Sequence, residues 1–184
     1  MDFIPLLIPD IFLIKPNMHG DKRGYFFESF RKDMLEKAIG YEVNFCQDNE
    51  SKSKKGVLRG LHFQLPPFSQ AKLVRVIDGS VLDVAVDIRK SSPTFGQHVT
   101  AELSSENNHQ LFIPHGFAHG FVVLSNSATF AYKVDNYYST DHDRGIIFDD
   151  QDLAIDWKLP SKQIQLSDKD KNHPTLSKSQ ELFK

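Results

Sequence analysis

The sequence predicts a mainly β protein of the jelly-roll or β-sandwich type. Three observations support this prediction. From residue 56 onward the chain consists of short apolar or alternating runs, turn-forming residues separate these runs at short intervals, and only one segment has helical periodicity. Many short strands at such a spacing are typical of β-sandwiches and of cupin-like jelly-roll barrels.

The first two elements lie in the N-terminal part of the chain. Phe3–Ile14 is apolar, but two prolines and an aspartate interrupt it and it lacks the basic start of a signal peptide, so we expect a strand and a turn. A short helix is expected over Ser29–Gly40, where apolar side chains recur on one face. Ser29 is placed to cap its first turn and Gly40 to end its last.

The next elements are strands. Asp78-Gly79 favours a tight type I′ hairpin turn, and it is flanked by the strand-like runs Lys72–Ile77 and Ser80–Arg89. The second run alternates between an apolar face and a face that carries charges. More strands are expected at Gln97–Leu103, Gln110–Ile113, Phe117–Leu124, Ala128–Val134 and Gly145–Phe148.

The chain is expected to form a single domain over residues 1–184, because no repeat or linker divides it. The polar tail from Pro160 is expected to wrap around the barrel.

The 22 basic and 24 acidic residues give a net charge of -2, which does not indicate binding to nucleic acid or to an anionic membrane. No apolar run reaches the ~18 residues of a membrane span. The single cysteine, Cys46, excludes an internal disulfide and fits a reducing, cytoplasmic location.

Two segments carry histidines in similar strand-like surroundings. They are Gly56–Gln64, which reads GVLRGLHFQ, and Pro114–Phe121, which reads PHGFAHGF. One such histidine alone is more often structural than catalytic, but the shared context of His62 and His119 favours a common cavity. The sequence has no phosphate-binding glycine loop, no GxSxG nucleophile motif and no HExxH zinc motif.

These two segments resemble the paired motifs of cupins, and the chain as a whole more closely resembles the dTDP-4-dehydrorhamnose 3,5-epimerases. The matching motifs run in the order of the family over nearly the whole chain. They are Asp21–Glu28, Phe45–Asn49, Arg59–Gln64, Gln70–Val74, Asp83–Arg89, Ser91–Gly96, Gly116–Phe121, Tyr132-Lys133 and Leu166–Asp170.

The resemblance implies epimerisation at C3 and C5 of a nucleotide-linked 4-keto-6-deoxy sugar, with dTDP as the expected nucleotide. The ketone acidifies the C–H bonds at both carbons, and inversion needs a base, an acid on the opposite face and a group that stabilises the enolate. By resemblance, His62 is the base, Asp170 orients it, Tyr132 is the acid, and Lys72 lies near the enolate oxygen.

The resemblance also implies a set of substrate contacts. Arg23, Arg59 and Lys169 are candidates for the diphosphate, since cationic side chains and arginine forks in particular suit phosphate oxygens. Tyr138 is expected to stack on the base. The other expected contacts are Glu28, Gln47, Asn49, His119 and Asp143.

No metal and no cofactor are expected. Metal-binding cupins supply two histidines and a glutamate from the first motif, whereas here Gln64 replaces the second histidine and no glutamate follows within Leu65–Lys72. His62 and His119 alone do not complete a site with three or four ligands.

The sequence alone leaves several alternatives to this function open. The chain could invert only C3 or only C5, or act on a related dTDP-, GDP- or CDP-linked sugar. A non-catalytic sugar-binding cupin is disfavoured by the presence of His62, Asp170 and Tyr132, and a metal-dependent cupin enzyme by Gln64. The family resemblance further implies a homodimer with an N-terminal strand at its interface.

Overall fold

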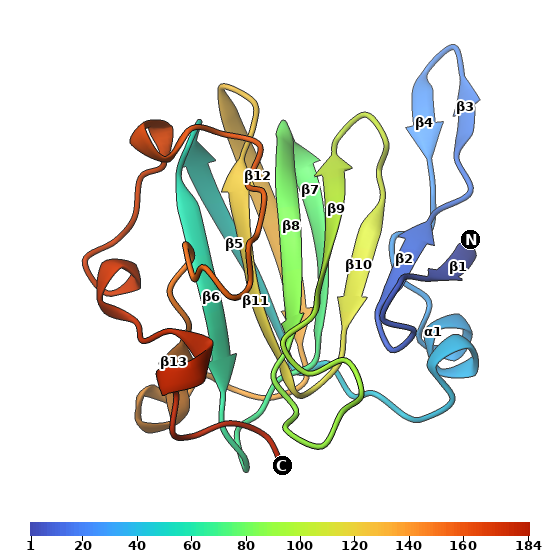
Figure 1. The fold of residues 1–184 in the computed structure, drawn as a ribbon. Helices are drawn as coiled ribbons and strands as arrows, with labels where there is room; N and C mark the ends of the chain where they lie inside the picture. Colours follow the sequence, from blue (N-terminus) through green and yellow to red (C-terminus); the bar gives the residue numbers. More distant parts are fainter.

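Two antiparallel sheets face each other in the computed structural model, which describes residues 1–184 (Figure 1). One sheet has the strand order β1-β2-β10-β7-β12-β5, the other has the order β13-β6-β11-β8-β9, and β3 and β4 form a separate hairpin. The jelly-roll-like, mainly β class predicted from the sequence is therefore confirmed. The bounds are β1 Asp2–Pro5, β2 Phe12–Lys15, β3 His19–Asp21, β4 Gly24–Phe26, α1 Lys32–Ile39, β5 Gln47–Lys54, β6 Leu58–Gln64, β7 Lys72–Asp78, β8 Ser80–Asp87, β9 His98–Ser104, β10 Gln110–Ile113, β11 Phe117–Val123, β12 Ser127–Val134 and β13 Asp143–Gly145.

Apolar side chains fill the space between the sheets and also cover their outer faces. The interior cluster includes Val74, Val81 and Phe130, whereas the outer face of the five-stranded sheet packs against Trp157 and other residues of the C-terminal segment. At the six-stranded sheet, α1 lies beside β2 (Figure 1), and its Leu35 is buried in a cluster with Ile14, Leu73 and Phe112. Burial of these faces on both sides supplies the main driving force for the fold.

The alternation predicted for the strand after Asp78-Gly79 has an unexpected orientation. Leu82 and Val84 belong to the outer cluster, while Val81 and Ala85 belong to the interior one. The charged face of β8 therefore points between the sheets, and Asp83 is fully buried there. The carboxyl group of Asp83 thus lies in the interior of the molecule and not on its solvent-exposed surface.

Most predicted elements match the structure to within a few residues, and two boundaries were wrong. The helix begins at Lys32 with Arg31 as its N-cap, because the carbonyl of Ser29 accepts a hydrogen bond from Gln110 and holds that residue outside the helix. Gly40 ends the helix as predicted, with a left-handed φ of 83°. The last strand is Asp143–Gly145 and not Gly145–Phe148, because Ile147 bonds to the C-terminal segment.

Three strands were not predicted. The edge strand β5 has the polar sequence QDNESKSK, and β3 and β4 form an exposed hairpin that projects from the body of the molecule (Figure 1). The C-terminal segment has short 3₁₀ turns at Ser161–Gln163, Asp170–Asn172 and Leu176–Lys178, and it covers the side of β6. No helix has the length and apolar character required to cross a membrane.

Candidate active site

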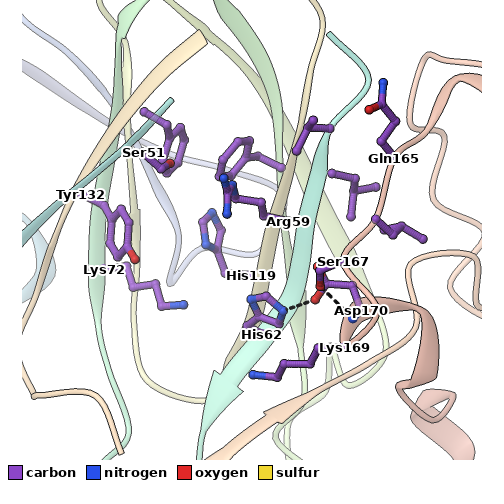
Figure 2. Close-up of a pocket in the computed structure, with 15 residues that line it drawn as sticks. Ser51, Arg59, His62, Lys72, His119, Tyr132, Gln165, Ser167, Lys169 and Asp170 are labelled. Atoms are coloured by element: carbon purple, nitrogen blue, oxygen red, sulfur yellow. Dashed lines mark hydrogen bonds and ion pairs between the residues drawn. The ribbon is translucent and has the colours of Figure 1, made fainter. Parts of the chain in front are cut away.

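A cavity of about 510 Å³ lies between the two sheets, and all four predicted catalytic groups line it (Figure 2). Strands of both sheets and the C-terminal segment contribute to its wall. The predicted site residues that line it are Arg59 and His62 from β6, Lys72 from β7, His119 from β11, Tyr132 from β12, and Lys169 and Asp170 from the C-terminal segment.

An irregularity in β6 explains how Arg59 and His62 both reach the cavity, although they are three residues apart. The register between β6 and β11 shifts, so that His119 pairs with His62 and Phe121 with Arg59. Such an irregularity changes which side chains face inward along a strand. The close approach needs Gly60, because a Cβ atom there would lie 2.5 Å from the Cα atom of Gly120.

His62 and Asp170 form a hydrogen-bonded pair at one wall of the cavity. The distance between His62 Nε2 and Asp170 Oδ1 is 2.5 Å, and the hydroxyl of Ser167 donates to Asp170 Oδ2 at 2.8 Å. Burial opposes ionisation of Asp170, but the neighbouring His173, His62 and Ser167 outweigh it, so the pKa of Asp170 lies well below its usual range.

The charge on Asp170 fixes the tautomer of His62. An ionised carboxylate only accepts hydrogen bonds, so Nε2 of His62 carries the proton and Nδ1 keeps a free lone pair. In Figure 2 this second ring nitrogen points toward the side of the cavity that holds Lys72 and Tyr132. His62 is thus arranged to accept a proton at Nδ1 and to share the resulting positive charge with Asp170.

Tyr132 lies across the cavity from His62, because β12 and β6 belong to opposite sheets (Figure 2). Burial raises the pKa of the Tyr132 phenol, and the nearby Arg59 partly opposes this shift. The phenol therefore stays protonated at neutral pH and can donate a proton. A side chain that can accept a proton therefore faces, across the cavity, one that can donate a proton.

Lys72 supplies a positive charge between these two walls. Burial lowers the pKa of Lys72 to about 8, while Asp83 and Asp143 act in the opposite direction. At pH 7 the side chain is mainly an ammonium, and it loses this charge as the pH rises through about 8. An ammonium at this position is suited to stabilise negative charge that develops on a substrate oxygen.

His119 is held by a buried carboxylate that the sequence did not assign to the site. Its Nε2 lies 3.0 Å from both oxygens of Asp83. Burial lowers the pKa of His119 despite this partner, and burial also raises the pKa of Asp83. The signal for Asp83 was present in the alternating run of β8, whose charged face is the interior one.

The donor set does not fit the metal centre of metal-binding cupins. His119 Nε2 is committed to Asp83. The Gln64 side chain donates to the carbonyls of Phe68 and Tyr137 and accepts from the amide of Ser139, so it fastens two loops together.

The remaining predicted substrate contacts do not line this cavity. Asp143 forms an ion pair with Lys169, which does line it, and accepts a hydrogen bond from the Tyr138 hydroxyl at 2.8 Å. Gln47 and Asn49 bond to each other and share the face of β5 on which Ser51 lines the cavity. Arg23 and Glu28, on and just after the β3–β4 hairpin, instead pair with their sequence neighbours Asp21 and Arg31.

Comparison with known proteins supports one family throughout. The family model for dTDP-4-dehydrorhamnose 3,5-epimerase matches residues 5–178. The dTDP-4-dehydrorhamnose 3,5-epimerase of Shigella flexneri is 55% identical over 172 residues, which cover 94% of each chain. The crystal structure of the dTDP-6-deoxy-D-glucose-3,5-epimerase of Legionella pneumophila, in complex with dTDP-4-keto-L-rhamnose, has a TM-score of 0.92 and 50% identity, covering 96% of this chain and 93% of that one.

A more distant neighbour has a narrower activity. The 3'-monoepimerase of Streptomyces bikiniensis, in complex with dTDP-quinovose, has a TM-score of 0.86 and 34% identity, covering 94% of this chain and 87% of that chain. The match of the family model over residues 5–178 and the identity of about one half to the 3,5-epimerases decide the assignment. The chain belongs to the dTDP-4-dehydrorhamnose 3,5-epimerase family.

Proposed function

We propose that this protein epimerises C3 and C5 of dTDP-4-dehydro-6-deoxy-D-glucose and yields dTDP-4-dehydro-L-rhamnose. One observation carries the chemical part of the proposal. The His62–Asp170 pair and the Tyr132 phenol come from opposite walls of a single cavity, with Lys72 also lining it. This is the arrangement that inversion of a carbon next to a ketone requires.

The proposed reaction proceeds by two similar proton transfers. His62 Nδ1 removes the proton from a carbon beside the C4 ketone, and the electron pair of the broken C–H bond forms the enolate. The Lys72 ammonium stabilises the enolate oxygen, while Asp170 stabilises the imidazolium of His62. Tyr132 then donates its proton to the opposite face of the carbon, which inverts the centre. Solvent returns a proton to the phenolate and takes up the proton of the His62 imidazolium, so both groups are ready for the second carbon.

In this proposal, cationic side chains bind the diphosphate of the nucleotide. Arg59 and Lys169 line the cavity and supply cationic groups for a diphosphate. The Legionella pneumophila relative binds dTDP-4-keto-L-rhamnose, which supports a dTDP-linked ligand for this chain as well. The identity to 3,5-epimerases exceeds that to the 3'-monoepimerase, and this difference favours inversion at both centres over inversion at C3 alone.

Product analysis tests this activity. Incubation with dTDP-4-dehydro-6-deoxy-D-glucose is expected to give a sugar with the L-lyxo configuration, identified by the ring couplings in proton NMR. Recovery of a product inverted only at C3 would support the monoepimerase alternative. An unchanged sugar that nevertheless binds would support a binding protein without catalysis.

We also propose that the protein acts as a homodimer. The β3–β4 hairpin pairs with no other strand of its own chain, and it exposes Tyr25 and Phe26 by 65% and 66%. Exposed aromatic side chains of this kind are enriched in protein interfaces. Arg23 and Glu28, at the same hairpin, do not line the cavity of their own chain, which fits a role in the site of a second copy.

Light scattering after size-exclusion chromatography is expected to give twice the chain mass of 21.0 kDa. Replacement of both exposed aromatics, Tyr25→Ser with Phe26→Ser, should shift this mass toward the monomer. A wild-type monomer at micromolar concentration would contradict the dimer.

We further propose a cytoplasmic location and a single domain over residues 1–184. The lone exposed Cys46 supports the location, and the continuous chain of strands supports the single domain.

A further inference from the structure

A second histidine lies behind the His62–Asp170 pair and takes no part in the proposed reaction. The ring of His173 meets that of His62 edge to face, with centroids 5.6 Å apart and an angle of 78°. Its side chain is only 11% exposed, and its Nε2 is buried without a hydrogen-bond partner. Oδ1 of Asp170 is 3.6 Å from this nitrogen, which is too long for a hydrogen bond.

The backbone holds the His173 ring in this position. A Cβ atom on Gly145 would lie 2.4 Å from His173 Nε2, so the ring occupies the space that any other residue at position 145 would need. Gly145 in turn is the register partner of His62 in the pairing of β13 with β6. The imidazole of His173 is therefore fixed beside the strand position that carries the base.

We propose that His62, Asp170 and His173 form a binding site for a divalent transition-metal cation such as Zn²⁺, and that its occupancy inhibits the enzyme. His62 Nε2, a carboxylate oxygen of Asp170 and His173 Nε2 all lie within 4.8 Å of one another. Two imidazoles and one carboxylate are a common ligand set for Zn²⁺, with bonds of about 2.0–2.2 Å. His173 Nε2 and Asp170 Oδ1 are 3.6 Å apart, a separation that two ligands of one cation can have, whereas His62 Nε2 and Asp170 Oδ1, at 2.5 Å, must move apart when a cation replaces the proton between them.

Two further features suit this site. Ser167 donates to the second oxygen of Asp170, as groups that orient a coordinating carboxylate do. The buried Nε2 of His173 has no other partner, so coordination would satisfy an atom that the fold leaves unpaired. The site differs from the metal centre of cupins, because His119 and Gln64 have other partners.

The inhibitory effect rests on the proposed function. A cation on His62 Nε2 replaces the proton shared with Asp170, which is released to solvent. Coordination withdraws electron density from the His62 ring. It also engages the Asp170 carboxylate, which then no longer stabilises a protonated His62. Nδ1 therefore becomes a poor base. The cation would sit on the side of His62 that faces Asp170 and leave the substrate cavity open. Zn²⁺ is therefore expected to lower kcat with little change in KM.

Binding is tested without reference to turnover. Tag-free protein is treated with EDTA, dialysed and titrated with Zn²⁺ by calorimetry, and with Co²⁺ by visible absorption. The wild type is expected to bind one cation per chain. His173→Phe, which keeps a ring over Gly145 but removes the nitrogens, should weaken the affinity at least about tenfold. His173→Ala serves as a second variant, and His109→Ala, which removes a histidine outside the cavity, should bind as the wild type does.

Turnover then tests the inhibition, with each variant compared with its own EDTA-treated activity. Zn²⁺ should inhibit the wild type and His109→Ala, with recovery on addition of EDTA, and should inhibit His173→Phe far less. Absence of stoichiometric binding, or equal affinities in the wild type and both His173 variants, would overturn the site. Binding with the expected ligand dependence in a protein that has no epimerase activity would instead refute only the proposed function.

Discussion

His62→Ala is expected to abolish nearly all epimerisation, with a loss of at least about 10²–10⁴-fold in kcat, the usual contribution of a positioned base. The physical reason is that the other histidine of this wall, His119, is almost fully buried, and burial lowers its pKa, so it is a poor base. Asp170 is hydrogen-bonded to His62 and lies behind it, and His119 is committed to Asp83. Deuterium incorporation at C3 and C5, followed by NMR, measures the loss directly.

The matched control for this variant is His109→Ala, which removes a histidine outside the cavity and should keep wild-type exchange. Asp170→Asn separates the two members of the pair, because His62 remains but its cation loses the stabilising charge. An intermediate loss is expected for that variant. Wild-type exchange rates in His62→Ala would show that another group is the base.

Tyr132→Phe is expected to separate proton exchange from inversion. Without the hydroxyl, His62 still forms the enolate and returns a proton or a deuteron to the face from which it came. Deuterium should therefore continue to enter the sugar, while net inversion slows by about 10²-fold or more. The ring of Tyr132 packs near Phe130, with centroids 6.0 Å apart, and phenylalanine retains this contact. Binding of the nucleotide should change little.

Two outcomes would revise the role of Tyr132. Equal losses of exchange and inversion at unchanged substrate affinity would assign the hydroxyl to stabilisation of the enolate. Inversion at the wild-type rate would remove Tyr132 from the mechanism. Parallel measurement of deuterium content and of product configuration in the same sample distinguishes these results.

The sequence pattern predicted those elements whose side chains are buried on one face or on both faces. The strand Gln110–Ile113 is buried throughout and was predicted to the residue, and the Asp78-Gly79 turn joins β7 to β8 as expected. The strand β5 could not be recognised in this way. Its inward residues are polar, and Ser51 among them lines the cavity, while its outward residues are charged because it is an edge strand exposed to solvent.

Site residues could be predicted from the sequence where they lie within the recognised motifs. His62 and His119 line one cavity and are direct register partners, in agreement with the shared cavity expected from their similar surroundings. The roles of Asp83 and His173 depend on tertiary structure. Asp83 becomes a partner of His119 only because β8 turns its charged face inward, and His173 reaches His62 only through the path of the C-terminal segment.

The isotope experiment on the wild-type protein tests the central claim most directly. Incubation with dTDP-4-dehydro-6-deoxy-D-glucose in deuterated water should place deuterium at both C3 and C5, with the L-lyxo product, because each inversion passes through an enolate that is reprotonated from solvent. Complete protein from which metals have been removed with EDTA should give the same result. Inversion without deuterium at either carbon, or no exchange at all, would contradict a proton-transfer epimerase built on His62 and Tyr132.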